Sequence, residues 1–198
     1  MRTVTVTGHG ETRVAPDSAV VRVAAVHRAA GVADALAGAD SAARQIVATG
    51  REHTTPERIG SSAVQIWSSH DQQGRPNGYE ARHSLTIGCP DVAAAGALLA
   101  ALADAVGERL QIEGVSLEIT DRSAAETTAR EAAYADAVER ATHLAGLAGA
   151  VLGDAHDVIE GGAPPGAPRP AKAMAAEVAL EPGEQAVAAS VTVVFQLR

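Results

Sequence analysis

The sequence predicts an α+β protein in which antiparallel sheets carry helices packed on one face. Segments with a two-residue apolar period alternate with segments of helical spacing, in the order β-β-α-β-β-α-β-α-β-β. Residues 18–119 read β-α-β-β-α-β, the split βαβ pattern of ferredoxin-like folds, in which the helices cover one face of the sheet. Both end segments are Val/Thr-rich strands, so they could pair with each other.

The first strand is predicted at residues 3–7, where Val alternates with Thr. Gly8-His9-Gly10 then indicates the end of this strand, in a tight turn or bulge that needs a positive φ. Ala15-Pro16-Asp17 indicates a second turn, and strand spacing returns at residues 18–27. One face of that strand is expected to carry Val21, Val23 and Ala25.

Residues 34–49 change to helical spacing. Strands follow at 59–69 and 79–87, separated by the polar stretch 72–78, in which Asn77-Gly78 is a hairpin signal. The expected apolar stripe of the helix is Ala35, Leu36, Ala39, Ala43, Ile46 and Val47. The expected inner face of the second strand is Tyr79, Ala81, His83, Leu85 and Ile87.

Pro90-Asp91 predicts the start of an Ala/Leu-rich helix at 92–106, followed by a strand at 111–119. That strand is expected to place Ile112, Val115, Leu117 and Ile119 on one face. The longest helix should begin at the capping-box pattern Ser123-Ala124-Ala125-Glu126 and continue to Gly149. Its recurring apolar positions are Ala129, Ala133, Ala137, Ala141, Leu144 and Ala145.

A short strand is expected at 151–160, and the last strand at 186–197. Between them, the Gly/Pro-rich residues 161–176 are interpreted as a flexible excursion. The face of the last strand should carry Val187, Ala189, Val191, Val193 and Phe195. With 198 residues, the chain can form one domain or two lobes that share a core.

Aromatic residues make up only 2% of the chain, so its core volume must come from Val, Leu, Ile and especially Ala. Ala-faced helices approach their neighbours closely but bury little area per residue. A modest stability margin would favour further burial between subunits, and a homo-oligomer is therefore hypothesised.

The net charge of −8 argues against nucleic acid or an anionic membrane surface as a partner, since both need a basic face. No run of about 18 apolar residues occurs, so we expect no membrane insertion. The first residues alternate at strand period and lack the apolar core of a signal peptide. As written, the sequence predicts a soluble cytoplasmic protein, or a periplasmic or exported one if a leader was trimmed.

The residues with chemical potential predict no catalytic, cofactor-binding or metal-binding site. Cys89 follows a strand as a small buried thiol, and the seven histidines form no HxH or HxxxH pair. His83 is expected in the core or at an interface. No GxSxG motif is present, and Ser61-Ser62 and Ser68-Ser69 simply flank a strand. The carboxylates that could pair only through the fold are Glu11, Asp17, Glu118 and Asp121.

Four segments together resemble the SIMPL domain family, formerly a domain of unknown function, over essentially the whole chain. They are Val4-Thr5-Val6-Thr7-Gly8-His9-Gly10 with Pro16-Asp17; Gly78-Tyr79-Glu80-Ala81 leading to Leu85-Thr86-Ile87; the Ala129, Ala133, Asp136, Ala137, Ala141, Leu144, Ala145 helix ending at Gly149 and Leu152-Gly153; and Glu181-Pro182-Gly183-Glu184 leading to Val191-Thr192-Val193-Val194-Phe195.

The resemblance implies a single SIMPL-like domain over residues 1–198 of bacterial type. Members of the family include periplasmic or outer-membrane-associated proteins linked to oxidative-stress defence, and immunogenic antigens. Some form ring- or channel-like oligomers, and a eukaryotic relative is a signalling adaptor. No catalytic residues are established for the family, so the resemblance assigns none here.

The expected function is therefore a non-enzymatic, self-associating protein with a scaffolding or stress-protective role. The alternative is a module that binds a small molecule or peptide, in a cleft between the hairpin at Gly78-Tyr79 and the third helix. A hydrolase is less favoured, and would require Ser, His and a carboxylate within hydrogen-bond reach. The identity of the ligand is unknown.

Overall fold

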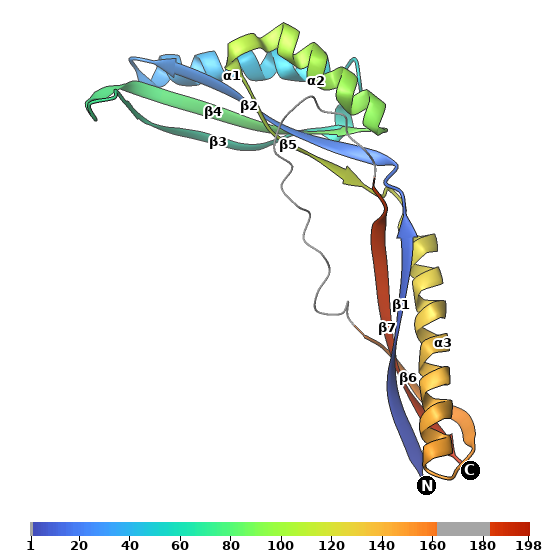
Figure 1. The fold of residues 1–198 in the computed structure, drawn as a ribbon. Coiled ribbons are helices and arrows are strands. Elements are labelled where there is room, and N and C mark those ends of the chain that lie inside the picture. Colours follow the sequence, from blue (N-terminus) through green and yellow to red (C-terminus); the bar gives the residue numbers. More distant parts are fainter. Residues whose placement is uncertain (1, 162–182) are drawn as a thin grey trace. The chain divides into compact units, whose positions relative to one another are not determined.

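The computed structural model describes residues 2–161 and 183–198, which contain three α-helices and seven strands in the predicted order (Figure 1). The strands form two antiparallel sheets, so the predicted α+β class is confirmed. The described residues divide into two compact units. Among the described residues, the first unit draws on the ranges 2–15, 119–161 and 183–198, and the second unit contains 16–118.

The second unit has the order β-α-β-β-α-β. Its elements are β2 (Ser18–Ala29), α1 (Val32–Gly50), β3 (Ile59–His70), β4 (Pro76–Cys89), α2 (Val92–Val106) and β5 (Leu110–Glu118). The strands lie in the order β3-β4-β2-β5, and every neighbouring pair is antiparallel. Each helix therefore connects two parallel strands that have a third strand between them, which confirms the split βαβ pattern.

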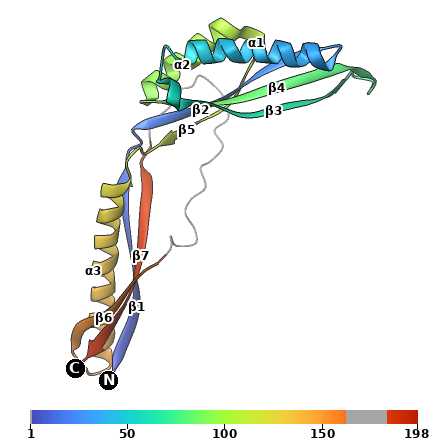
Figure 2. The same ribbon diagram turned by 180° about the vertical axis from the view of Figure 1, so that it is seen from behind.

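Helices α1 and α2 pack on the same face of this sheet, and the unit's main core lies beneath them (Figure 2). The predicted inward faces of β2 and β4 are confirmed, since Val21, Val23, Leu85 and Ile87 are almost fully buried. The prediction that Leu36 lies in the apolar stripe of α1 is wrong, because Leu36 is 44% exposed. Ala42 is buried in its stead, because small side chains let α1 lie close to the sheet.

The hairpin between β3 and β4 turns earlier than Asn77-Gly78 predicted. Asp71 Oδ1 accepts hydrogen bonds from the backbone N–H groups of Gln73 (2.9 Å) and Arg75 (2.8 Å), and Gly74 has φ +77°. This side-chain-stabilised turn allows β4 to begin at Pro76. Asn77 and Gly78 therefore lie within the strand.

The first unit consists of β1 (Thr3–Val14), α3 (Ser123–Leu147), β6 (Leu152–Gly161) and β7 (Gln185–Leu197), with strand order β1-β7-β6. Strands β1 and β7 pair without a register shift from Thr3 opposite Gln196 to Val14 opposite Gln185. The structure thus pairs the two end strands, which the sequence left as an open option. Helix α3 runs along β1 and β7 (Figure 1).

The predicted break at Gly8-His9-Gly10 is wrong, because β1 continues through it and neither glycine has a positive φ. A Cβ at Gly8 would lie 2.0 Å from the carbonyl oxygen of Ala133, and one at Gly10 would lie 2.1 Å from that of Ala129. The glycines are thus required by a helix backbone in direct contact with the strand. The buried stripe of α3 consists entirely of alanines: Ala125, Ala129, Ala133, Ala137, Ala141 and Ala145.

Helix α3 starts at Ser123 as predicted, but the capping box does not form. Asp121 Oδ1 accepts hydrogen bonds from the Ser123 backbone N–H (2.8 Å) and hydroxyl (2.6 Å). These hydrogen bonds lower the pKa of the Asp121 carboxyl. Leu144, predicted in the stripe, is 43% exposed.

The Gly/Pro-rich excursion predicted at 161–176 lies outside the described residues, except for Gly161, the last residue of β6. In residues 2–161 and 183–198, no helix combines the length and apolar character needed to cross a bilayer.

Candidate functional site

A cavity of about 340 Å³ lies between α1 and the β3–β4 hairpin of the second unit. One wall is a single face of α1, from Asp40 to Ala48, with Arg51 directly after the helix, and the opposite wall contains Ser61, His83 and Leu85. The cavity exists because α1 packs mainly on β2 and β4 and extends little over β3.

Ser61 and His83 form the polar centre of this cavity. Ser61 Oγ lies 2.8 Å from His83 Nε2, a hydrogen bond between β3 and β4. The predicted strand alternation correctly placed His83 on the helix-facing side, where it is half-buried. An extra residue in β3 between Ser61 and Ala63 interrupts the pairing beside it, and such bulges re-aim neighbouring side chains.

The Ser61–His83 pair supplies two of the three groups of a hydrolytic triad. Asp40 lines the same cavity, but its carboxylate binds Arg44. Among the described residues, no carboxylate hydrogen-bonds to His83. The pair can therefore donate and accept hydrogen bonds, and lacks the acid that orients a catalytic imidazole.

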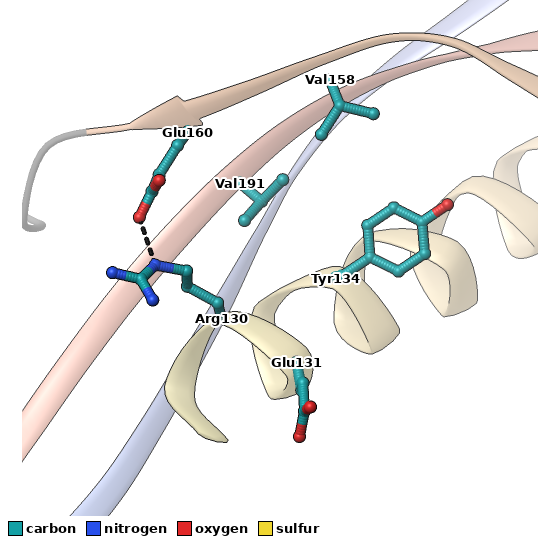
Figure 3. Close-up of a pocket in the computed structure, with 6 residues that line it drawn as sticks. All are labelled: Arg130, Glu131, Tyr134, Val158, Glu160 and Val191. Atoms are coloured by element: carbon teal, nitrogen blue, oxygen red, sulfur yellow. Dashed lines mark hydrogen bonds and ion pairs between the residues drawn. The ribbon is translucent and has the colours of Figure 1, made fainter. Parts of the chain in front are cut away.

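A second cavity, of about 540 Å³, lies in the first unit beside α3 (Figure 3). Tyr134, Val158 and Val191 give it an apolar lining, and Arg130 of α3 closes one side by an ion pair with Glu160 of β6 at 2.5 Å. This hydrogen bond to Glu160 raises the pKa of Arg130. Since Arg130 also contacts Glu126 at 3.4 Å, its charge is already neutralised.

The face of the second unit's sheet opposite to α1 and α2 carries a network of charged and polar side chains. Arg82 Nε (3.1 Å) and Nη2 (2.6 Å) both donate to Glu113 Oε1, and Ser84 Oγ donates to the same oxygen at 2.9 Å. The hydrogen bonds from Arg82 are the main reason that the pKa of Glu113 is lowered. The network satisfies the hydrogen-bonding groups of Arg82, Ser84 and Glu113 with one another, so it is interpreted as structural.

The edge strand β1 is protected by α3. The His9 backbone N–H donates to Asp136 Oδ2 (2.9 Å), and Arg140 Nη1 donates to the Thr7 carbonyl oxygen (2.7 Å). These side chains occupy backbone groups that an incoming strand would need. The edge strands β5 and β6 are instead irregular, with pairing shifts, and both carry carboxylates.

Strand β3 is the exception among the described edge strands. It pairs regularly with β4 from Ala63 to Ser69, and residues 59–69 contain no charge and no proline. Val64 (54%), Ile66 (40%) and Trp67 (41%) are exposed. A long, uncharged, apolar edge is a surface on which another strand can pair.

Of the other predicted chemical groups, Asp17 and Glu118 are neighbours, because the Asp17 backbone N–H donates to the Glu118 carbonyl oxygen at 3.1 Å. Glu11 pairs with Arg13, and Asp121 stabilises the start of α3. Cys89 is fully buried, and burial raises the pKa of its thiol. Among the described residues, no group of three His, Cys, Asp or Glu side chains could hold a metal ion.

Sequence reasoning interpreted Ser61 only as a residue that flanks a strand, and it did not single out Arg44 or Arg51. The alternation of β4 indicated that His83 faces the helices, but only the bulge in β3 brings Ser61 to it. The binding cleft expected between Gly78-Tyr79 and the third helix joins residues of the two separate units, and it stays a prediction.

The elements described above define an α+β protein with a ferredoxin-like unit and a second unit built on its end strands. The sequence model of SIMPL, a protein of unknown function (DUF541), matches residues 4–195. The chain therefore belongs to the SIMPL family. No curated protein matches it.

A search of solved structures found a similarity to a hydantoinase/carbamoylase family amidase from Burkholderia ambifaria. The two chains share 16% identity with a TM-score of 0.29, over 60% of this chain. The match spans only 34% of the amidase chain. A similarity at this level carries no argument about function.

Proposed function

We propose that this protein is non-enzymatic and self-associates through the β3 edge, with a scaffolding or stress-protective role in a bacterial cell. The observation that carries the self-association is the uncharged, exposed edge of β3, in a molecule whose β1 edge is blocked by Asp136 and Arg140. The protective role is supported by the resemblance to SIMPL proteins linked to oxidative-stress defence.

The sequence of β3 is complementary to itself. Antiparallel pairing of two copies about Gln65 sets Val64 opposite Ile66 on the helix-facing side of the sheet. On the other side it sets the small Ala63 opposite Trp67. Apolar and aromatic cross-strand pairs stabilise a sheet, and no like charges meet in this register. A second copy of the chain is therefore the partner that best fits this edge.

Light scattering of the purified protein tests the proposal. We expect a mass above that of a 20.0 kDa monomer, and a monomer mass for the double variant Val64→Lys, Ile66→Lys. Lysines on an edge strand repel a second copy, and both positions are exposed enough to accept them without unfolding. Ile159→Lys is the control, because Ile159 is 54% exposed on β6 in the other unit. It should leave the mass unchanged.

A cysteine cross-link tests the register. Gln65→Cys should yield a disulfide-linked dimer under mild oxidation, whereas the wild type should not, because Cys89 is buried. A wild-type protein that remains monomeric at high concentration would contradict self-association. An oligomer that survives the lysine double variant would contradict the β3 edge as its interface.

A further inference from the structure

The cavity between α1 and the β3–β4 hairpin contains a combination of side chains that the self-association of β3 does not use. Arg51 directly follows α1 and lines the same cavity as the Ser61–His83 pair. Arg44 lines it from about two turns earlier on the same face of the helix. We propose that this cavity binds a small molecule through an oxyanion group, a phosphate or a carboxylate.

The guanidinium of Arg51 is the main reason for assigning an anion. It lines the cavity and forms no ion pair among the described residues, whereas Arg44 is paired with Asp40. The two arginines outnumber the single carboxylate, so the cavity wall carries an excess of positive charge in a chain of net charge −8. An unneutralised guanidinium in a cavity is a specific donor for phosphate or carboxylate oxygens.

Ser61 and His83 supply further hydrogen-bonding groups that an oxyanion also needs. A serine hydroxyl can rotate to donate to a ligand, and an imidazole nitrogen can either donate or accept. Their mutual hydrogen bond of 2.8 Å holds both groups on the wall opposite α1. An anion in the cavity would therefore meet arginine donors on the α1 side and the hydroxyl and imidazole groups on the strand side.

The apolar part of the wall limits what else can enter. Ala43, Val47 and Leu85 line the cavity between the polar groups. A volume of about 340 Å³ accommodates a small metabolite and excludes a folded partner. The ligand class is thus a compact molecule with one oxyanion and an apolar remainder.

Calorimetric titration of the full chain with inorganic phosphate and, separately, with acetate tests the site and distinguishes the two anions. We expect at least one of them to bind, and Arg51→Gln to weaken its binding about tenfold, the order of effect of one hydrogen bond to a charged group. Ser61→Ala should weaken it by a smaller factor. Both residues are exposed, so neither variant should unfold the protein, which circular dichroism checks.

Arg122→Gln is the matched control. Arg122 is an exposed arginine at the start of α3 in the other unit, and its substitution removes the same charge outside the cavity. Its affinity should equal that of the wild type. If Arg51→Gln and Arg122→Gln lose the same amount of anion affinity, net charge alone explains the effect and the proposed site is wrong. The proposal is also wrong if neither anion binds. Trp67→Lys, on the side of β3 that faces away from the helices, should bind the anion normally even where it disrupts the edge, which separates this outcome from any failure of self-association.

Discussion

At the residue scale, Gly8 and Gly10 determine how closely α3 can approach β1. A Cβ at Gly8 would meet Ala133 O at 2.0 Å and Ala137 N at 2.5 Å, and both are backbone atoms of a helix that cannot yield locally. The Gly-x-Gly pattern looks like a turn signal in the sequence. In the structure it is the strand side of a close strand–helix contact, and the alanine stripe of α3 is the helix side.

We predict that Gly8→Ala destabilises the protein by about 3 kcal/mol, because overpacking forces strand and helix apart. Urea unfolding followed by circular dichroism measures the change. Gly60→Ala is the control, since Gly60 also lies in a strand but has no atom within 4 Å of an added Cβ. A loss below about 0.5 kcal/mol in Gly8→Ala, the range of ordinary surface substitutions, would show that the contact is loose.

Glu113 gives the protein an acid-sensitive contribution to stability. Its folded pKa is lowered chiefly by the hydrogen bonds from Arg82, so the carboxylate stabilises the fold above the unfolded pKa of Glu, about 4.3. That contribution is lost as the pH falls through the lower folded pKa.

We therefore expect Glu113→Gln to be less stable than wild type by about 1 kcal/mol at pH 7, allowing for partial exposure of the pair. The difference should shrink toward zero as the pH falls below about 4, because the wild-type carboxyl then also becomes neutral. Urea midpoints measured from about pH 2.5 to about pH 7, a range that includes the unfolded pKa of Glu, test this. Glu108→Gln, at an exposed site without an ion pair among the described residues, should show no such convergence.

At the element scale, periodicity predicted the helices and strands well because each buries one defined face. The alternation of Val21, Val23 and Ala25, and of Leu85 and Ile87, required one buried side, and the sheet supplies it. The order of elements then led to the split βαβ unit. The antiparallel pairing of β1 and β7 was only an open option from their composition, because local periodicity does not identify a distant partner strand.

The errors at this scale come from contacts between elements. Glycine usually ends a strand, and only the approach of α3 explains why 8–10 does not. Asn77-Gly78 is a good hairpin signal, but Asp71 stabilises an earlier turn with its side chain. Leu36 and Leu144 follow helical periodicity, yet they lie beyond the edges of the narrow alanine contacts.

The candidate site was less predictable than the fold for the same reason. The cavity depends on how far α1 extends over β3, and the Ser61–His83 hydrogen bond depends on the extra residue in β3. Neither feature has a sequence motif. The protection of β1 likewise needs Asp136 and Arg140 to lie along the strand, where they meet the backbone of His9 and Thr7.

At the scale of the whole molecule, each of the two described units has a main hydrophobic core of its own, in place of the shared core that the length allowed. The core of the first unit is a layer of alanines against Val6, Val191, Val193 and Phe195. The second unit's core contains the larger aliphatic side chains of α1, α2, β2 and β4. Because alanine contacts bury little area, we expect the first unit to have the lower stability.

Gly8→Ala also tests whether each core is a separate cooperative unit. Trp67, the single tryptophan, lies in the second unit, so its fluorescence reports unfolding there. We predict that Gly8→Ala lowers the urea midpoint of the first circular-dichroism transition, because α3 is lost with the first unit. The midpoint of the Trp67 fluorescence should stay that of the wild type, since the substitution touches no residue of the second core. An equal shift in both signals would show that the two cores unfold as one cooperative unit.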